Sequence, residues 1–225
     1  MQEVMNHEQL DLFEPNISID NNSQNFTSLN FEKLSLSNAE ITFYPHFFSR
    51  EESDDFLEKL MNTIKWQQDY ISLYGRQIPI PRQTAWYGDE DRSYTYSGIR
   101  MLPKAWNDTL LKIKQRIENV AKIQYNSVLV NLYRDGKDGV AWHSDDEPEL
   151  GDTPIIGSVS FGGERRFMLK PKNKTLQEKH EILLNHGSFL LMTGTTQKHW
   201  LHQIPKTSKK VEQRINLTFR IIKNL

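Results

Sequence analysis

The chain contains no cysteine among its 225 residues. Disulfide bonds, zinc sites built from thiolates and cysteine nucleophiles are therefore excluded, and the absence suits a reducing compartment. The chain also lacks any apolar run approaching the roughly 18 residues that a membrane-spanning helix needs. Its first residues show no basic segment followed by an apolar one. We therefore expect neither a membrane-spanning segment nor an export signal.

An excess of charge of one sign is also missing, since the net charge is only −1. The charge is nevertheless unevenly distributed. Residues 1–40 hold seven acidic residues and one basic residue, a balance of −6, whereas the remainder has a balance of +5. A mildly basic body behind an acidic N-terminal segment is compatible with a polyanionic partner such as nucleic acid.

The composition supports a folded domain over most of the chain. Apolar residues make up 37 %, with 5 Trp, 8 Tyr and 11 Phe available for a core. Residues 1–38 are rich in Asn and Ser without sustained periodicity, which predicts an acidic, disordered N-terminal tail. Residues 39–225 then predict one domain of ordinary size.

Helical patterns come first in this domain, and strand patterns follow. Ser49 and Glu52 form a capping box ahead of an apolar helical stripe, and a second helix is expected from Pro103 to about Ile123. Between them, residues 69–98 alternate aromatic segments with Gly and Pro breaks, as in hairpins. Short strands are expected at 127–133, 155–161, 165–170, 188–193 and 214–222. This order predicts an α+β fold, an antiparallel sandwich or jelly roll braced by helices.

The stretch VAWHSDDEPEL, residues 140–150, gathers polar and ionisable groups that suit a metal ion or a cationic ligand. These groups are His143, Asp145, Asp146 and Glu147. Residues two apart in a strand share a face, so His143 and Asp145 can present an imidazole and a carboxylate to one point. A third ligand, either His199 or His202, would complete the two-His-one-carboxylate face of a non-haem Fe(II) site. The alternative is a surface loop with a helix-capping Asp.

The stretch RINLTFR separates polar from apolar residues at strand spacing. Its polar face carries Arg214, Asn216, Thr218 and Arg220. Two arginines lining the inside of a β fold need anions, because an unpaired buried charge is costly. A dicarboxylate would satisfy both guanidiniums, and Asn131 and Tyr133, which alternate in the same way, would add hydrogen bonds. The alternative is an ordinary amphipathic strand with an exposed polar face.

Five motifs taken in order carry a resemblance to a known family. They are NLYRDGKDGVAWHSDDE, SVSFG, HGSFLLM, HWLHQIP and RINLTFR. Together they resemble the AlkB family of Fe(II)/2-oxoglutarate-dependent DNA repair dioxygenases, in particular the branch of the animal nuclear enzymes, over residues 41–222. The resemblance implies a double-stranded β-helix (jelly-roll) core at 127–225, preceded at 39–126 by helices and nucleotide-recognition hairpins. It also implies Fe(II) and 2-oxoglutarate as cofactors and O2 as co-substrate.

The same resemblance assigns roles to individual residues. It implies that the iron ligands, which are the catalytic centre, are His143, Asp145 and His202. It implies that 2-oxoglutarate is bound by Asn131, Tyr133, Arg214, Asn216, Thr218 and Arg220. Arg214 would hold the distal carboxylate and Arg220 the carboxylate beside the keto group. Only the resemblance selects His202 over His199, which is then expected to be a packing or supporting residue.

The implied activity is oxidative N-demethylation of alkylated nucleobases in DNA, such as 1-methyladenine and 3-methylcytosine. It is coupled to decarboxylation of 2-oxoglutarate, releases formaldehyde and succinate, and is a direct-reversal DNA repair. The implied substrate contacts are Tyr74, Gly75, Arg82, Tyr94, Tyr96, Asp146 and Glu147. Tyr94 and Tyr96 would clasp the flipped base, while Tyr74 at a hairpin tip would fill the vacated stack. The two acids would favour positively charged bases, and Arg82 would contact a phosphate or a base.

Two alternatives to DNA demethylation stay open. The same iron and co-substrate core could act as a hydroxylase or demethylase of RNA, protein or a small molecule, although residues 70–98 resemble nucleotide-recognition hairpins. The second alternative is a binding module without catalysis, against which the complete set of iron ligands and both arginines argue.

The acidic tail holds one short motif, QLDLF at residues 9–13. It resembles the peptide by which bacterial replication proteins dock on the sliding clamp, and a small apolar cluster that covers the domain is the alternative. We expect DNA as a partner, a bacterial sliding clamp as a second one through this motif, no membrane, and a monomeric chain. The expected location is a bacterial cytoplasm, or the nucleus if the chain is eukaryotic.

Overall fold

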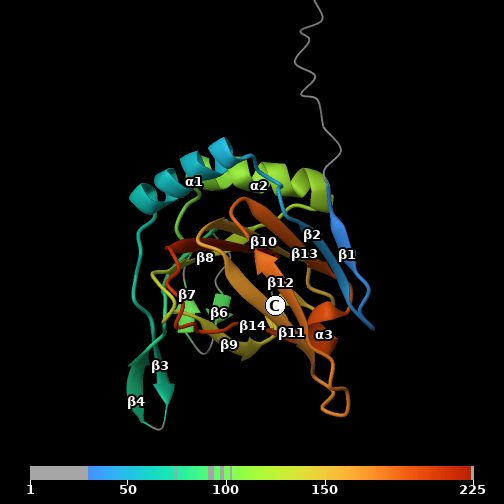
Figure 1. Ribbon diagram of the computed structural model, residues 1–225. Helices are drawn as coiled ribbons and strands as arrows, with labels where there is room; N and C mark the ends of the chain where they lie inside the picture. The colour runs from blue at the N-terminus through green and yellow to red at the C-terminus, as the bar shows by residue number, and fades with distance from the viewer. Residues whose placement is uncertain (1–29, 74, 91–93, 97–98, 102, 224–225) are drawn as a thin grey trace, which may run out of the picture.

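The computed structural model describes residues 30–73, 75–90, 94–96, 99–101 and 103–223. In this part of the chain, two antiparallel sheets lie face to face, and two long helices cover the outer side of the larger sheet (Figure 1). None of the helices described is long and apolar enough to cross a membrane. The arrangement confirms the predicted α+β fold with a jelly-roll core braced by helices.

The larger sheet has seven strands in the order β1-β2-β13-β10-β15-β8-β5. Their bounds are Glu32–Leu34 for β1, Glu40–Tyr44 for β2, Gln83–Gly88 for β5, Ser127–Tyr133 for β8, Ile156–Gly162 for β10, Ser188–Thr193 for β13 and Arg214–Arg220 for β15. The smaller sheet has the order β12-β11-β14-β9. Its bounds are Val140–His143 for β9, Arg165–Pro171 for β11, His180–Leu184 for β12 and Trp200–Ile204 for β14.

The remaining elements are helices and two isolated hairpins. The helices are α1 (Arg50–Thr63), α2 (Asp108–Ala121) and α3 (Thr196–His199), with a short 3-10 turn at Pro148–Leu150. The hairpins pair β3 (Tyr70–Leu73) with β4 (Arg76–Pro79) and β6 (Tyr94–Tyr96) with β7 (Ile99–Met101). The β3–β4 hairpin projects from the body of the molecule (Figure 1).

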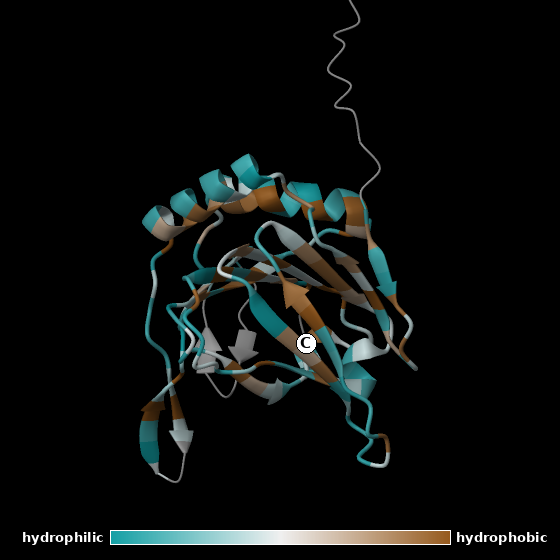
Figure 2. Cartoon of the chain, in the orientation of Figure 1, coloured by the Kyte–Doolittle hydropathy of each residue, from teal (hydrophilic) through white to brown (hydrophobic). Residues whose placement is uncertain are grey.

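The start of α1 follows the sequence prediction. The Ser49 side chain accepts a hydrogen bond from the Glu52 backbone, and the Glu52 carboxylate accepts one from the Ser49 backbone, which completes the capping box. Phe56 and Leu60 then face the core. Figure 2 shows hydrophobic colour on the side of α1 and α2 that faces the sheet.

The predicted start of the second helix at Pro103 is wrong. The helix α2 begins at Asp108, where the Asn107 side chain accepts a hydrogen bond from Leu110 N at 2.9 Å. The preceding residues are held by the sheet, because Lys104 N donates to Trp86 O and Gly88 N donates to Lys104 O. Lys104 therefore pairs with β5 and does not join the helix.

The expectation of disorder over residues 1–38 is contradicted at its C-terminal end. The strand β1 pairs with β2, and the rings of Phe31 and Tyr44 lie 5.6 Å apart. Leu34 packs against the core between the two sheets. This segment gains its order from a long-range partner, which local composition does not report. Residues 1–29, including the QLDLF motif, lie outside the described residues.

Two apolar cores lie on opposite sides of the larger sheet, and β15 contributes to the outer one. Its residues Ile215, Leu217 and Phe219 join the cluster that contacts α1 and α2. The inner cluster fills the space between the sheets around Phe167 and Trp200. The polar residues of β15 face that inner space, so the alternation in RINLTFR directs charged groups between the sheets.

Candidate active site

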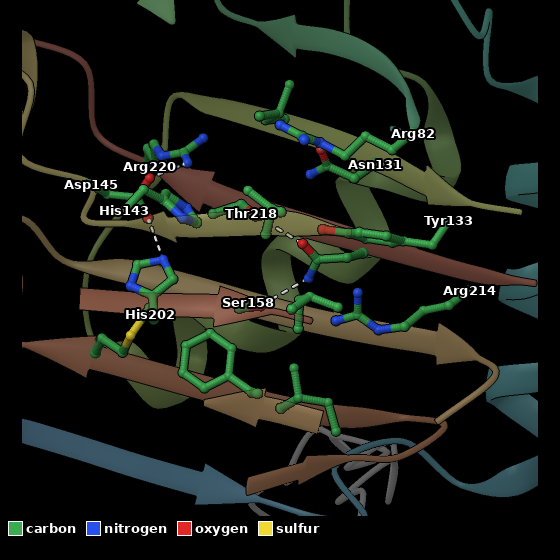
Figure 3. A pocket seen from close by; sticks show the side chains of 17 residues that line it. Arg82, Asn131, Tyr133, His143, Asp145, Ser158, His202, Arg214, Thr218 and Arg220 are labelled. Carbon is green, nitrogen blue, oxygen red and sulfur yellow. Dashed lines mark hydrogen bonds and ion pairs between the residues drawn. The ribbon is translucent and has the colours of Figure 1, made fainter. Parts of the chain in front are cut away.

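A pocket between the two sheets collects most of the predicted site residues (Figure 3). Its polar lining consists of Arg82, Asn131, Tyr133, His143, Asp145, Ser158, His202, Arg214, Asn216, Thr218 and Arg220. Its apolar lining consists of Leu129, Val140, Phe167, Leu184, Met192 and Ile204. Both the predicted iron ligands and the predicted 2-oxoglutarate contacts therefore border one space.

The two predicted histidine ligands meet through strand pairing. His143 ends β9 and lies opposite His202 of β14, with ring centroids 4.2 Å apart. Asp145 follows two residues after His143, and its Oδ2 lies 3.8 Å from His202 Nε2. Asp145 and His202 are buried, with exposed fractions of 2 % and 5 %. The fold thus brings an imidazole pair and a carboxylate to the same end of the pocket.

The environment keeps this trio in the protonation state that binds a cation. Burial, together with the nearby His143, lowers the pKa of His202 to about 3. Burial would raise the pKa of Asp145, but Arg220 and the two histidines lower it to about 2. His143 Nδ1 lies 2.8 Å from Ala141 O, so Nδ1 carries the proton and Nε2 keeps its lone pair. At neutral pH the three groups are two neutral imidazoles and one carboxylate.

These donor types fit Fe(II), which prefers two imidazoles and one carboxylate with open positions beside them. The positions of the three side chains, however, do not form a complete metal site. Among the described residues, no three His, Asp or Glu side chains form a group that could hold a metal ion as they stand. Asp145 Oδ1 is instead bound by Arg220 Nη2 at 2.5 Å. The trio is therefore a candidate set defined by donor type and pairwise approach.

Arg214 presents an incompletely satisfied cation to the other end of the pocket. Its side chain is 1 % exposed and donates from Nη2 to Ser160 Oγ at 2.9 Å, while Nε and Nη1 make no hydrogen bond of standard geometry to the described residues. Tyr133 is the neighbour that favours its charged form. Burial lowers the pKa of Arg214 to about 10, so it still carries its charge at neutral pH. Its guanidinium lies 5.0 Å from the centroid of the Tyr133 ring. A buried cation with open donors favours an anionic ligand in the pocket.

Neutral polar side chains connect the two ends of the pocket. Asn216 Nδ2 donates to Ser158 Oγ at 2.8 Å and to Val159 O at 3.0 Å, and Thr218 Oγ1 donates to Asn216 Oδ1 at 3.1 Å. Asn131 lies opposite Asn216 in the β8–β15 pairing. All six predicted 2-oxoglutarate residues thus lie on β8 and β15 and face the same space. Ser158 also lines the pocket; it was not among the predicted residues, although SVSFG alternates in the same way.

Arg82 lies inside the pocket rather than on the surface. It is 5 % exposed, and its Nε donates to Asn131 Oδ1 at 2.8 Å while Nη1 donates to Gly139 O at 3.5 Å. This burial favours a contact inside the pocket over one along a DNA backbone, and the predicted contact to a phosphate or a base stays a prediction. Its position beside Asn131 leaves a contact to a ligand within the pocket.

The two predicted acidic substrate contacts do not line the pocket. Asp146 is exposed and forms an ion pair with Lys172, with Oδ2 and Nζ 2.6 Å apart. Glu147 precedes the 3-10 turn and is partly buried. Both lie directly after Asp145, at the border of the iron trio. The acidic run is thus split between one buried ligand candidate and two groups outside the pocket.

The predicted aromatic substrate contacts are described only in part. Tyr74 lies outside the described residues. Gly75 is exposed in the β3–β4 turn with a φ of 73°, a backbone conformation that suits glycine. Tyr94 and Tyr96 belong to β6, which pairs with β7, and only their backbones are described.

His199 does not pack or support the site, contrary to our expectation, because it is exposed at the end of α3. The supporting residue is Gln197, two positions earlier. It is 1 % exposed, and its Oε1 accepts a hydrogen bond from Asp145 N at 2.9 Å. A lone Gln between Thr and Lys carries no sequence pattern that would have revealed this contact.

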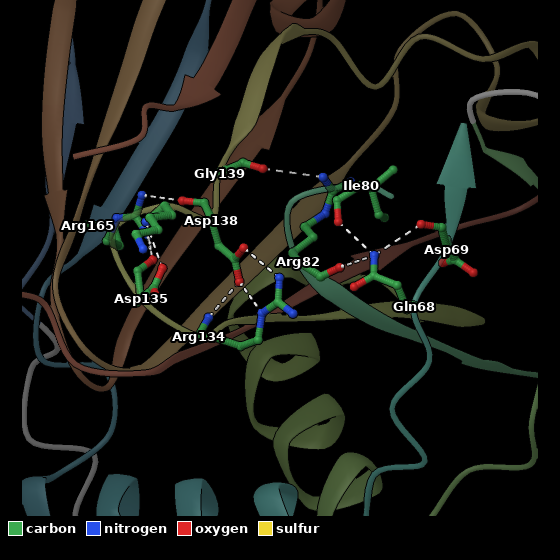
Figure 4. Close-up of polar contacts among 10 residues, drawn as sticks. Gln68, Asp69, Ile80, Arg82, Arg134, Asp135, Asp138, Gly139 and Arg165 are labelled. Atoms are coloured by element: carbon green, nitrogen blue, oxygen red, sulfur yellow. Dashed lines mark hydrogen bonds and ion pairs between the residues drawn. The ribbon is translucent and has the colours of Figure 1, made fainter. Parts of the chain in front are cut away.

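The loop from residue 134 to 139 joins β8 to β9 and thereby connects the two sheets (Figure 4). Within it, Arg134 holds Asp138 by two side-chain hydrogen bonds of 2.8 and 2.9 Å. Arg165 of β11 donates to Asp138 O at 2.8 Å and to Pro205 O at 2.7 Å. These contacts hold the loop between the strand that carries Tyr133 and the strand that carries His143.

The chain is similar to several known proteins. The family model described as "2OG-Fe(II) oxygenase superfamily" matches residues 40–220. The rat protein "Alpha-ketoglutarate-dependent dioxygenase alkB homolog 3" is 42% identical over 192 residues, covering 82% of this chain and 64% of the relative. The human protein of that name is also 42% identical, with 82% and 66% covered. The bovine "DNA oxidative demethylase ALKBH2" is 35% identical, with 80% and 68% covered.

The chain spans slightly less than two thirds of the length of the alkB homolog 3 relatives. Among solved structures, "The structure of OsALKBH1" superposes with a TM-score of 0.60 at 15% identity, covering 85% of this chain and 100% of the other. This likeness supports the fold alone.

Proposed function

We propose that this chain, which belongs to the 2OG-Fe(II) oxygenase superfamily and to its AlkB members, is a dioxygenase that removes alkyl groups from nucleobases in DNA. One observation of the structure carries the proposal. The pocket between the sheets has two histidines and an aspartate at one end, and the buried Arg214 with open donors at the other. A metal with a bound dicarboxylate would satisfy both ends at once.

The residues present fit both cofactors by chemistry. His143, Asp145 and His202 would hold Fe(II), which with 2-oxoglutarate and O2 supplies the hydroxylation of an N-methyl carbon. Arg214 would bind the distal carboxylate of 2-oxoglutarate through its open Nε and Nη1 donors. Arg220, which now binds Asp145, would bind the carboxylate beside the keto group.

The protein itself positions these groups and excludes water from them. Asn131, Tyr133, Asn216 and Thr218 line the space between the two arginines and would bind the oxygens of 2-oxoglutarate. The apolar lining around Phe167 limits the access of water to the reacting atoms. One oxygen atom of O2 would enter the N-methyl group and the other would enter succinate, formed from 2-oxoglutarate with loss of CO2. The hydroxymethyl group would then leave as formaldehyde and restore the base.

We propose 1-methyladenine and 3-methylcytosine as substrates, since the relatives include proteins named as DNA oxidative demethylases. Both bases carry positive charge, which Asp146 and Glu147 beside the trio would favour. A base must leave the stack to reach the pocket. The projecting β3–β4 hairpin (Figure 1) and the β6 strand with Tyr94 and Tyr96 would hold the flanking nucleotides and the flipped base.

The wider setting of the chain is part of the same proposal. We propose a bacterial cytoplasmic enzyme, active as a monomer, that docks on a sliding clamp through QLDLF at residues 9–13. A clamp pull-down with wild-type chain and with Leu12→Ala and Phe13→Ala together tests this part. Equal recovery of both proteins would contradict it.

The direct test measures formaldehyde released from oligonucleotides that carry 1-methyladenine or 3-methylcytosine, with Fe(II) and 2-oxoglutarate present. We expect stoichiometric formaldehyde and succinate from methylated DNA and none from unmodified DNA. His143→Ala should abolish release, whereas the exposed His199→Ala should retain most of it. Methylated RNA, single-stranded DNA and duplex DNA form separate arms. Succinate formation without formaldehyde from any nucleic acid would overturn the DNA proposal and leave the dioxygenase.

A further inference from the structure

Gln197 is a buried polar residue that contacts the Asp145 backbone and has no part in the proposed function above. It lies in α3, the four-residue helix between β13 and β14, with 1 % of its surface exposed. Both ends of its side-chain amide are occupied. Oε1 accepts from Asp145 N at 2.9 Å, and Nε2 donates to Met192 Sδ at 3.4 Å. Because a backbone N–H only donates, the orientation of this amide is fixed.

The contact falls where the backbone leaves the sheet. β9 ends at His143, so Asp145 lies beyond the strand pairing with β14. Its backbone N–H is bound by Gln197, and its carboxylate Oδ1 by Arg220 Nη2 at 2.5 Å. Two different elements, α3 and β15, therefore determine where the Asp145 carboxylate points.

The helix α3 is itself firmly anchored. Thr196 Oγ1 accepts from Glu40 N at 2.9 Å and donates to Thr193 O at 2.6 Å. Lys172 N donates to His199 O at 2.8 Å, which ties the end of α3 to the end of β11. Gln197 is thus a buried side chain on a helix that is held at both ends.

The same short segment also carries the second histidine ligand. β14 begins directly after α3, and His202 lies in its middle, opposite His143. A displacement of α3 would move His202 and, through Gln197, Asp145 together. Met192, which holds the other end of the Gln197 amide, lines the same pocket. The contact therefore couples two of the three candidate iron ligands.

We propose that Gln197 is a positioning residue that holds the Asp145 carboxylate in register with His202 and so sets the affinity of the pocket for a divalent metal. The inference rests on the metal site of the proposed function. Partners that orient metal ligands typically change metal affinity by 10- to 100-fold when they are removed. The Gln197 bond fixes the backbone of one ligand only, so the lower end of that range is expected.

The test compares Gln197→Met with the matched control Gln203→Met. Gln203 lies in β14 and donates to Met168 Sδ at 3.6 Å, so it is also a glutamine paired with a methionine, but it does not line the pocket. Anaerobic titration of the metal-free proteins with Co(II) is followed by its visible absorption, and titration with Fe(II) by calorimetry. We expect Gln197→Met to bind both metals about 10-fold more weakly, with an altered Co(II) spectrum. Gln203→Met should bind both as wild type does.

A milder variant keeps the test decisive if Gln197→Met fails to fold. Met192→Leu preserves volume and removes only the acceptor for Gln197 Nε2, so we expect a loss of metal affinity of about 2- to 3-fold. Circular dichroism and melting of the metal-free proteins establish that each variant is folded. Unchanged metal affinity in the folded variants, or an equal loss in Gln203→Met, would overturn the proposal. Wild-type protein that binds neither metal would instead overturn the proposed function.

Discussion

The two faces of β15 have nearly equal burial and opposite chemistry. Ile215, Leu217 and Phe219 are fully buried on the side of the helices, where they belong to an apolar cluster. Arg214 and Arg220 are only 1 % and 2 % exposed on the side of the smaller sheet, where polar and charged groups surround them. The outer face therefore stabilises the fold, whereas Arg214 on the inner face keeps Nε and Nη1 donors without a hydrogen bond to the described residues. A buried charge at such a place indicates function rather than stability.

The largest expected effect comes from Arg214→Met, which removes the charge from the inner face. Because the distal carboxylate of 2-oxoglutarate would lose its cationic partner inside the protein, we expect its KM to rise about 100-fold. The free energy of unfolding should not fall, since a desolvated guanidinium is replaced by an apolar chain. Steady-state kinetics over a wide range of 2-oxoglutarate, together with urea unfolding, measure both quantities.

Leu217→Ala sharpens the comparison from the other face. A fully buried leucine that becomes alanine leaves a cavity and costs about 3 kcal/mol of unfolding free energy. The folded fraction should keep the KM of wild type for 2-oxoglutarate. Two results would contradict the assignment of stability to the outer face and ligand binding to the inner face. One is an equal change of this KM in Leu217→Ala and Arg214→Met. The other is an equal loss of unfolding free energy in the two variants.

A pH effect is expected where α1 meets the outer side of the sheet. His186 Nδ1 accepts from Gly162 N at 2.7 Å, and its Nε2 lies 3.1 Å from Asp54 Oδ1. Burial lowers the pKa of His186, while Asp54 opposes and Arg50 assists this shift. The neutral form is thus favoured in the folded state, and its stabilisation is present above the unfolded pKa of about 6.5 and lost as the pH falls below it.

We therefore expect the midpoint of urea unfolding to decrease from pH 7.5 to pH 5, and to decrease less in His186→Gln. The buried histidines of the pocket contribute to the same slope, so the difference between the two proteins is the informative quantity. A slope unchanged by His186→Gln would show that His186 does not contribute to the pH dependence of stability.

The smallest effect is expected outside both faces, at the ion pair between Asp146 and Lys172. The side chains are 55% and 30% exposed, so Lys172→Met should change the unfolding free energy by less than about 0.5 kcal/mol. Release of Asp146 should raise the preference for cationic 3-methylcytosine over neutral 3-methylthymine by a few-fold. The ratio of kcat/KM for the two bases measures this, with Lys174→Met as the control. An equal change of the ratio in both variants would indicate a general effect of surface charge.

Much of this organisation follows from local patterns. The alternation in RINLTFR and SVLVNLY assigned each residue of β15 and β8 to a face, since successive side chains of a strand point to opposite sides. The bounds of β8 and β13 and the capping box at Ser49 also agree with the structure. The short strand β12 was not predicted, because its five residues show too little alternation of polar and apolar side chains.

Other features were decided only by contacts between distant segments. Spacing alone left His199 and His202 equivalent, but the pairing of β14 with β9 buries His202 beside His143 and leaves His199 exposed. The placement of Arg82 inside the pocket depends on Asn131, 49 positions away, and that of Gln197 on Asp145, 52 positions away. The sequence determined which face each strand buries because that property has a period of two residues. Only the tertiary structure decided which residues contact one another across the pocket. These contacts depend on how the two sheets pack together, and no periodic pattern in the sequence reports that packing.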